Sequence, residues 1–128
     1  MAKVLVCGSR GNFKDYRELV FGVLGGQSNI EIIEGCCPNS ADQYAEEFAI
    51  KQGQFYPIKI THFPSNSGNY LKRNIEMVNA CDEVIAFWDG WSYGTAHTVA
   101  CAVARKKPVW IIDLEKEDNH IKLEKFIK

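Results

Sequence analysis

The sequence lacks an excess of charge of either sign. Its 15 Lys and Arg residues are balanced by 16 Asp and Glu residues, which gives a formal net charge of −1 at pH 7 over 128 residues. Proteins that follow the phosphate backbone of nucleic acids usually carry a clear basic excess. The composition therefore disfavours extensive nucleic-acid binding, although it leaves room for a local basic patch.

Long apolar runs and paired cysteines are missing as well. No apolar run approaches the length of a membrane span, and the N-terminal stretch "VLVC" is too short for the h-region of a signal peptide. The five cysteines form no CxxC pair, and the adjacent Cys36 and Cys37 lack the spacing of a zinc finger. We therefore expect a cytoplasmic protein with reduced thiols, no membrane partner, no cofactor and no metal.

What the sequence does contain is a regular alternation of apolar runs and helical patterns, which predicts one domain spanning residues 1–128. Runs typical of buried strands cover 3–7, 30–35, 54–63, 82–88 and 108–114, and helical spacing covers 15–24, 39–53, 70–81 and 96–107. Pro57 places the third strand at an edge of the sheet. In the third helix we expect Leu71, Ile75 and Val78 to face inward, and we expect a short helix in the tail after residue 114.

Strands that alternate with helices predict βαβ units and an α/β fold. The specific expectation is a three-layer Rossmann-like sandwich with a five-stranded parallel sheet in the order 3-2-1-4-5. In such a sheet, ligands bind at the carboxyl ends of the strands, where the strand order reverses between strands one and four. The loops expected there are "GSRGNF", "GCCPNS", "FPSNSGN" and "WDGWSYGT".

Two of these loops carry residues that fit a phosphorylated ribose. In "GSRG", backbone N–H groups, Ser9 and Arg10 suit a phosphate. In "WDGWSYGT", Gly90 and Gly94 let the backbone approach a ligand.

The same second loop offers polar and aromatic side chains. Ser92 and Thr95 place hydroxyl groups at a helix N-terminus, Asp89 can accept hydrogen bonds from ribose, and Trp91 or Tyr93 can stack on a base. Each feature also has an ordinary structural explanation. Asp-Gly is a common turn dipeptide, and a Trp here could instead cap the helix or contact another copy of the chain.

Four motifs in order, "VLVCGSR", "GCCPNSAD", "RNIEM" and "VIAFWDGWSYGT", resemble those of the SLOG (SMF/DprA–LOG) Rossmannoid superfamily, most of all its small stand-alone YspA-like members from bacteria and phages. The similarity covers roughly Lys3 to Asp113. It implies a nucleotide-like ligand, such as an ADP-ribose-like signal, a nucleoside monophosphate or single-stranded DNA. It also implies a homo-oligomer, because relatives often pair through helices. By position, the binding residues that the resemblance implies are Gly8, Ser9, Arg10, Gly35, Ala41, Asp42, Arg73, Asn74, Gly90, Gly94 and Thr95.

The resemblance leaves the question of catalysis open. The phosphoribohydrolases of this superfamily carry a catalytic Glu two positions after the Thr of the Gly-rich turn, where this sequence has His97. Nucleoside deoxyribosyltransferases resemble the same region and also use a Glu near that place. Cleavage of an N-glycosidic bond needs a carboxylate as nucleophile or as stabiliser of an oxocarbenium-like centre, and a His does neither well.

We therefore expect a sensor, carrier or sequestering protein for a nucleotide-like molecule. Arg10 and Arg73 would neutralise phosphate, and Asp89 or Asp42 would hold ribose. An N-glycosidic-bond enzyme is the alternative, with Arg73, His97, Asp89 and Asp42 as candidate catalytic residues. A nucleic-acid-binding module is the third candidate, which the charge balance disfavours. Arg73 in a surface ion pair and Asp42 in a helix cap are the structural alternatives.

Overall fold

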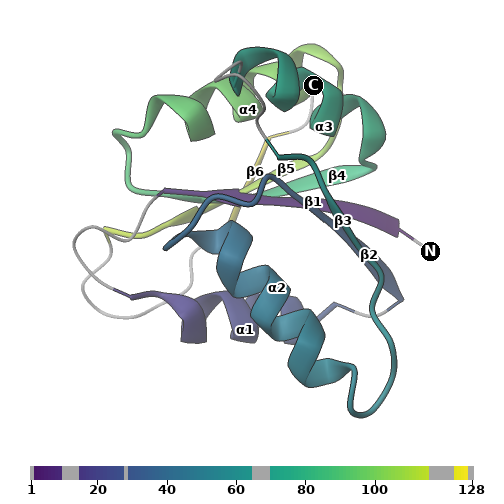
Figure 1. Cartoon of the computed structure of the whole chain (residues 1–128). Coiled ribbons are helices and arrows are strands. Elements are labelled where there is room, and N and C mark those ends of the chain that lie inside the picture. Colours follow the sequence, from purple (N-terminus) through teal and green to yellow (C-terminus); the bar gives the residue numbers. More distant parts are fainter. Residues whose placement is uncertain (1, 10–14, 28, 65–69, 116–122, 127–128) are drawn as a thin grey trace.

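A computed structural model describes residues 2–9, 15–27, 29–64, 70–115 and 123–126 (Figure 1). The strands are β1 (Ala2–Gly8), β2 (Ile30–Glu34), β3 (Ile60–His62), β4 (Glu83–Trp88), β5 (Val109–Asp113) and β6 (Leu123–Phe126). The helices are α1 (Arg17–Gly25), α2 (Ala41–Gln52), α3 (Tyr70–Ala80) and α4 (Tyr93–Ala104).

The strands form one sheet in the order β3-β2-β1-β4-β5-β6, and β1 to β5 are all parallel. The predicted Rossmann-like architecture and the order 3-2-1-4-5 are therefore confirmed. The third strand is much shorter than the expected 54–63, but it does lie at an edge. Pro57 precedes it and has no N–H to contribute to a ladder.

The expectation of a helix in the tail is wrong for residues 123–126, which form β6 antiparallel to β5. Without β6, the N–H and C=O groups along the outer side of β5 would lie at an open sheet edge. Pairing of β5 with β6 satisfies these groups. Because the gain comes from backbone hydrogen bonds, it requires no alternation of apolar and polar side chains, and the charged tail shows none that would predict a strand. The rest of the tail, 116–122 and 127–128, lies outside the described residues.

Two helices cover each face of the sheet: α1 and α2 lie on one side, and α3 and α4 lie on the other (Figure 1). Alternation along β1 feeds both cores, because successive side chains of a strand point to opposite faces. Val4 and Val6 pack with α1 and α2, whereas Leu5 and Cys7 pack with α3 and α4. β1 is thus buried on both faces, as the apolar run 3–7 predicted.

The inward face that the sequence predicted for α3 is confirmed only in part. Val78 is buried and Ile75 packs partly buried against the core, but Leu71 is 59% exposed. The buried residues of the helix are Asn74, Met77 and Val78. These three have the spacing i, i+3, i+4 of a single helical stripe. Because Asn74 is polar, the apolar pattern of the sequence did not identify it as part of the inward face. The first turn of α3, which carries Leu71, projects beyond the core.

Gly8 lets the end of β1 approach α2 closely. A Cβ atom at this position would lie 2.8 Å from Ala41 Cβ, from the carbonyl oxygen of Phe87 and from Tyr16 Oη. The Tyr16 hydroxyl donates a hydrogen bond to the Ser9 carbonyl and accepts one from Ala41 N at 2.8 Å. The strand end, the N-terminus of α2 and β4 are therefore held together at one point. None of the helices in the described part of the chain is long and apolar enough to cross a bilayer.

Candidate functional site

A cavity of about 520 Å³ opens at the carboxyl ends of β1, β2 and β4. This is the edge at which the strand order reverses, where the sequence analysis placed the site. The predicted residues that line the cavity are Gly8, Ser9, Gly35, Asp42, Arg73, Asn74, Asp89, Ser92, Gly94 and Thr95. The structure thus brings residues from four separate segments of the chain around one space.

Six residues that the sequence analysis selected require separate comment. Arg10 lies outside the described residues. The other five, which do not line the cavity, are Ala41, Gly90, Trp91, Tyr93 and His97. Trp91 is 80% exposed, so its ring is not positioned to stack on a base inside the cavity. Gly90 has a φ of 90°, a left-handed conformation that suits glycine, so its described role is to turn the backbone after β4.

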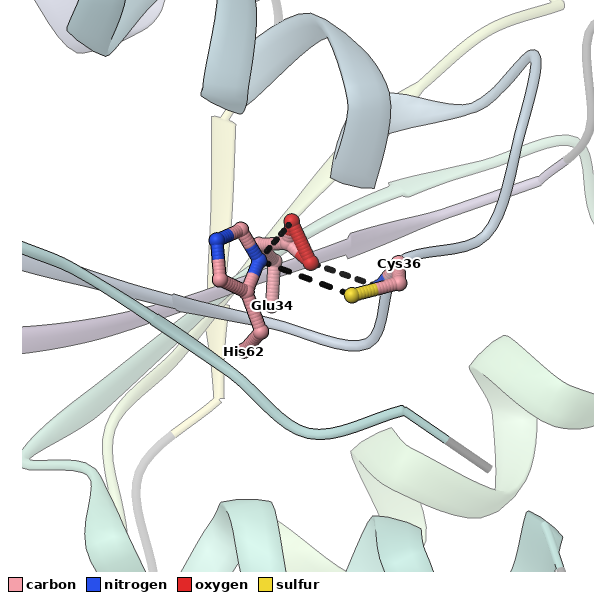
Figure 2. A group of neighbouring side chains, drawn as sticks. All are labelled: Glu34, Cys36 and His62. Carbon is pink, nitrogen blue, oxygen red and sulfur yellow. Dashed lines mark hydrogen bonds and ion pairs between the residues drawn. The ribbon is translucent and has the colours of Figure 1, made fainter. Parts of the chain in front are cut away.

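At the end of β2, a fully buried carboxylate begins the loop on one side of the cavity. Glu34 Oε1 accepts a hydrogen bond from Cys36 N at 2.6 Å, and Glu34 Oε2 lies 3.3 Å from Nδ1 of His62 (Figure 2). Cys36 follows with a φ of 63°, in the left-handed region. The loop therefore bends sharply immediately after the strand.

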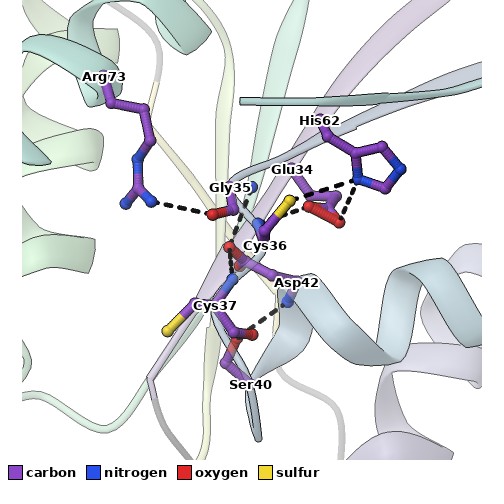
Figure 3. A network of polar contacts seen from close by, with 8 residues as sticks. All are labelled: Glu34, Gly35, Cys36, Cys37, Ser40, Asp42, His62 and Arg73. Atoms are coloured by element: carbon purple, nitrogen blue, oxygen red, sulfur yellow. Dashed lines mark hydrogen bonds and ion pairs between the residues drawn. The ribbon is translucent and has the colours of Figure 1, made fainter. Parts of the chain in front are cut away.

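Asp42, the second residue of α2, holds the same loop from the other side. Its Oδ2 accepts hydrogen bonds from Gly35 N at 3.0 Å and from Cys37 N at 3.2 Å (Figure 3). The residue is only 5% exposed. Burial, supported by the negative charge of Glu34, raises the pKa of the Asp42 carboxyl to about 7, and the two backbone hydrogen bonds and Arg73 only partly oppose this rise.

Arg73 reaches from α3 to the opposite side of the loop after β2. Its Nη1 donates to the Gly35 carbonyl at 3.0 Å and its Nη2 to Asn74 Oδ1 at 3.3 Å, while its guanidinium lies 5.4 Å from the centre of the Tyr70 ring. Its Nε is buried without a hydrogen-bond partner among the described residues. Within the same part of the chain, Arg73 makes no ion pair. The surface ion pair considered for Arg73 is thus not observed there.

Asp89 organises the loop that leads into α4. Its Oδ1 accepts hydrogen bonds from Trp91 N at 2.8 Å and from Ser92 N at 2.9 Å, and the Ser92 hydroxyl lies 3.1 Å from the same oxygen. Partial burial acts to raise the pKa of Asp89, but these hydrogen bonds and one from the Ser9 side chain hold it below its usual value. Asp89 is therefore an ionised carboxylate already engaged by its own loop.

The N-terminus of α4 faces the cavity with Gly94 and Thr95. Ser92 is its N-cap residue, yet the Ser92 side chain makes no capping hydrogen bond and turns to Asp89 instead. At α2, by contrast, Ser40 accepts a hydrogen bond from Asp42 N. Of the two helices that point at the cavity, only α2 is closed by its own cap side chain.

His97 lies behind the lining of the cavity. Its Nδ1 is 3.2 Å from Asn74 Nδ2, and its Nε2 is 3.5 Å from Cys101 Sγ. Asn74 also donates to the Gly94 carbonyl at 3.4 Å, so this buried amide joins α3 to the start of α4. Of the four catalytic candidates, Arg73, Asp89 and Asp42 border the cavity and His97 lies behind its lining.

The cavity also has lining residues that the sequence analysis did not select. They are Cys7, Cys36, Cys37, Pro38, Pro64, Tyr70, Met77 and Thr98. Helical spacing could have found two of them, because Tyr70 lies three residues before Arg73 and Thr98 three residues after Thr95. The apolar residues give one wall of the cavity the character of a surface for a flat or apolar group.

Comparison of the chain with protein-family models and with curated proteins gives no match.

Proposed function

We propose that this protein binds a nucleotide or nucleotide-derived small molecule, such as a nucleoside monophosphate or an ADP-ribose-like compound, in the cavity at the carboxyl edge of the sheet. It would act as a sensor, a carrier or a sequestering protein. The observation that carries the proposal is that the Arg73 guanidinium and the first turn of α4 line the same cavity. Among the described residues, the hydrogen-bond acceptors of this guanidinium are the neutral Gly35 carbonyl and Asn74 amide.

The phosphate would lie between Arg73 and the N-terminus of α4. The helix dipole and the N–H groups of a first turn favour an anion, and a guanidinium forms charge-assisted hydrogen bonds with phosphate oxygens. Thr95 adds a hydroxyl group at the same place. Because Ser92 is occupied with Asp89, its side chain does not compete for these N–H groups.

The remaining surface supports the nucleoside part of such a ligand. Pro38, Pro64, Tyr70 and Met77 offer apolar contacts for a base. The volume of about 520 Å³ is in the range of sites for small organic ligands. Asp42 is better placed than Asp89 to meet a ribose, since both oxygens of Asp89 accept hydrogen bonds within its own loop.

The test compares Arg73→Met with Arg105→Met by titration calorimetry against nucleoside monophosphates, ADP-ribose and the matching nucleosides. Arg105 is the control because it lies at the opposite end of α4, where it donates to Asn79. We expect the phosphorylated ligands to bind the unchanged protein and Arg73→Met to weaken them roughly 10- to 100-fold, the value of a charged hydrogen bond. Equal affinities in the two variants, or no binding of any phosphorylated ligand, would refute the proposal.

Cleavage of an N-glycosidic bond is a second candidate, and it rests on Asp42. This carboxyl group lines the cavity, and burial raises its pKa to about 7, so it holds a proton near neutral pH as a general acid must. We expect an enzyme to release free base from a nucleoside monophosphate and Asp42→Asn to abolish the release while ligand binding persists. If a nucleoside monophosphate binds but no free base is released, the catalytic candidate is refuted and only the binding function remains.

A further inference from the structure

Three potential metal ligands meet at the outer side of the loop after β2. The register of β2 with β3 pairs Glu34 with His62, and Cys36 follows Glu34 by two residues. The chain leaves the strand after Glu34, and the left-handed backbone of Cys36 turns its thiol back toward His62. Figure 2 shows the three side chains pointing toward one another, and their donor atoms all lie within 4.8 Å of one another.

Two of the three distances between these donors match the edges of a tetrahedron around zinc, and the third lies within 4.8 Å. Zn–S, Zn–N and Zn–O bonds of about 2.3, 2.0 and 2.0 Å at tetrahedral angles place S and N about 3.5 Å apart and N and O about 3.3 Å apart. In the structure, Cys36 Sγ is 3.5 Å from His62 Nδ1, and this nitrogen is 3.3 Å from Glu34 Oε2. The pairs Cys36 Sγ–His62 Nδ1 and His62 Nδ1–Glu34 Oε2 are therefore already at the spacing of zinc ligands.

The backbone conformation of Cys36 determines the direction of its thiol. Its φ of 63° is a left-handed conformation in which a residue with a Cβ atom is strained, so glycine would be the least costly residue here. The side chain that this position retains is a thiol directed at the imidazole of His62.

The local charge also favours a cation. Glu34 is 0% exposed, and its charge acts on Asp42, a second buried carboxyl group on the far side of the same loop (Figure 3). Burying a carboxylate is costly unless a positive charge accompanies it. The partner of Glu34 in the structure is His62, an imidazole that carries a charge only when protonated.

We propose that Glu34, Cys36 and His62 bind one Zn²⁺ ion, with a fourth position open to solvent. Thiolate, imidazole and carboxylate are the ligands that zinc prefers, and three protein ligands leave one coordination position for water. The side chain of His62 is 41% exposed and Cys36 is exposed, so an ion can enter from solvent. Cys36 also lines the cavity, so the metal site adjoins the proposed nucleotide site, although Glu34 and His62 are not among the lining residues. The site departs from the expectation of no metal because pairing of β2 with β3 brings Glu34 beside His62.

The test measures binding of Zn²⁺ alone by competition with a chromophoric chelator, and of Co²⁺ by absorption. We expect one Zn²⁺ per chain and, with Co²⁺, a thiolate-to-metal charge-transfer band together with the intense visible bands of a tetrahedral site. Loss of an outer-sphere partner typically costs 10- to 100-fold in metal affinity, so we expect Cys36→Ser and His62→Ala to raise the Kd at least roughly 100-fold.

Two further variants separate metal binding from folding. Cys37→Ser is the matched control, because the Cys37 side chain points away from His62 (Figure 3), and it should keep the affinity for Zn²⁺. Cys36→Gly removes the ligand but relieves the left-handed strain, so it should lose Zn²⁺ while its metal-free form unfolds at a higher temperature than the unchanged protein. Substoichiometric binding, no thiolate band, or equal losses in the Cys36 and Cys37 variants would overturn the proposal.

Discussion

Asp42 and Asp89 hold two loops on opposite sides of the cavity in the same way but in different surroundings. Each carboxylate accepts hydrogen bonds from two backbone N–H groups of its own loop: Gly35 and Cys37 for Asp42, Trp91 and Ser92 for Asp89. Nevertheless, the pKa of Asp42 is raised to about 7, whereas the pKa of Asp89 is lowered.

Because both carboxylates accept two backbone hydrogen bonds, the difference between their pKa shifts comes from the extent of their burial and not from the number of backbone hydrogen bonds. Asp42 is nearly inaccessible and close to Glu34, so the desolvation of its charged form outweighs its hydrogen bonds. Asp89 is only partly buried, and hydroxyl groups add to its backbone donors. The loop after β2 is therefore closed and holds a carboxyl group that titrates near neutral pH, while the loop after β4 carries a stable negative charge.

The largest effect on the free energy of unfolding should come from Asp42→Asn, which removes the titratable carboxyl group. Between about pH 4 and pH 7 the folded protein keeps a proton on Asp42 that the unfolded chain has lost, so the free energy of unfolding falls as the pH rises. Relative to Asp42→Asn, whose side-chain oxygen can still accept the two N–H groups, the unchanged protein should lose up to about 4 kcal/mol over this range. Urea denaturation at a series of pH values measures the difference.

Asp89→Asn is the counterpart of that experiment and should show the opposite sign. Because the pKa of Asp89 is lowered on folding, its stabilising effect is present above the usual Asp pKa and is lost as the pH falls through the folded value. The difference between this variant and the unchanged protein should shrink only in acid. Parallel pH profiles for the two variants would contradict the distinction between the two loops.

A smaller effect on the free energy of unfolding should follow from adding one methyl group to the loop after β2. In Gly35→Ala, the new Cβ would lie 3.0 Å from Arg73 Cζ and 3.1 Å from Asp42 Oδ2, so one of these groups must move. We expect a loss of about 2 kcal/mol in the free energy of unfolding by urea denaturation. Displacement of Arg73 should also weaken the binding of a phosphorylated ligand.

Gly94→Ala is the matched substitution on the other side of the cavity, where the loop after β4 enters α4. A Cβ at Gly94 meets nothing within 4 Å, and Gly94 lies in the first turn of α4. We expect this variant to be stabilised by about 0.5 kcal/mol, since alanine is the better helix former. A loss in Gly94→Ala as large as that in Gly35→Ala would mean that the two loops are equally crowded.

The smallest loss should come from Asp89→Ala. This change removes the acceptor for Trp91 N and Ser92 N in a partly exposed loop, where water can replace it, and we expect a cost of about 1 kcal/mol, as for the loss of a helix cap. Thermal or urea unfolding at neutral pH provides the measurement. Asp89→Asn should restore most of the loss, and an alanine variant as stable as the unchanged protein would show that Asp89 does not organise this loop.

Much of the cavity could be predicted because sequence order and sheet topology are linked. Apolar runs at regular intervals identify parallel strands, and the carboxyl ends of parallel strands share one edge. Ser9 and Thr95 could thus be assigned to one site from two distant segments, whereas Gly8 and Asp42 were assigned to it by the resemblance of their motifs to a known superfamily. The same reasoning could not place Trp91 or His97, because position on an edge does not determine the direction of a side chain.

Two predictions, the inward face of α3 and the helix in the tail, departed from the structure for related reasons. Periodicity identifies a helical face by its apolar residues, but the face of α3 begins with the buried amide of Asn74. Strand β6 has no pattern of its own because it forms in response to the open edge of β5. In both cases the determining interaction is with a distant part of the chain.

The sequence by itself determined the alternation of elements, the strand order and the edge on which the polar loops gather, because these follow from local periodicity and chain connectivity. Only the tertiary structure decided that the pKa of Asp42 is raised to about 7 while that of Asp89 is lowered, and that Glu34, Cys36 and His62 meet. Burial and strand pairing cause these results. Both depend on residues far apart in the chain, so neither can be derived from spacing alone.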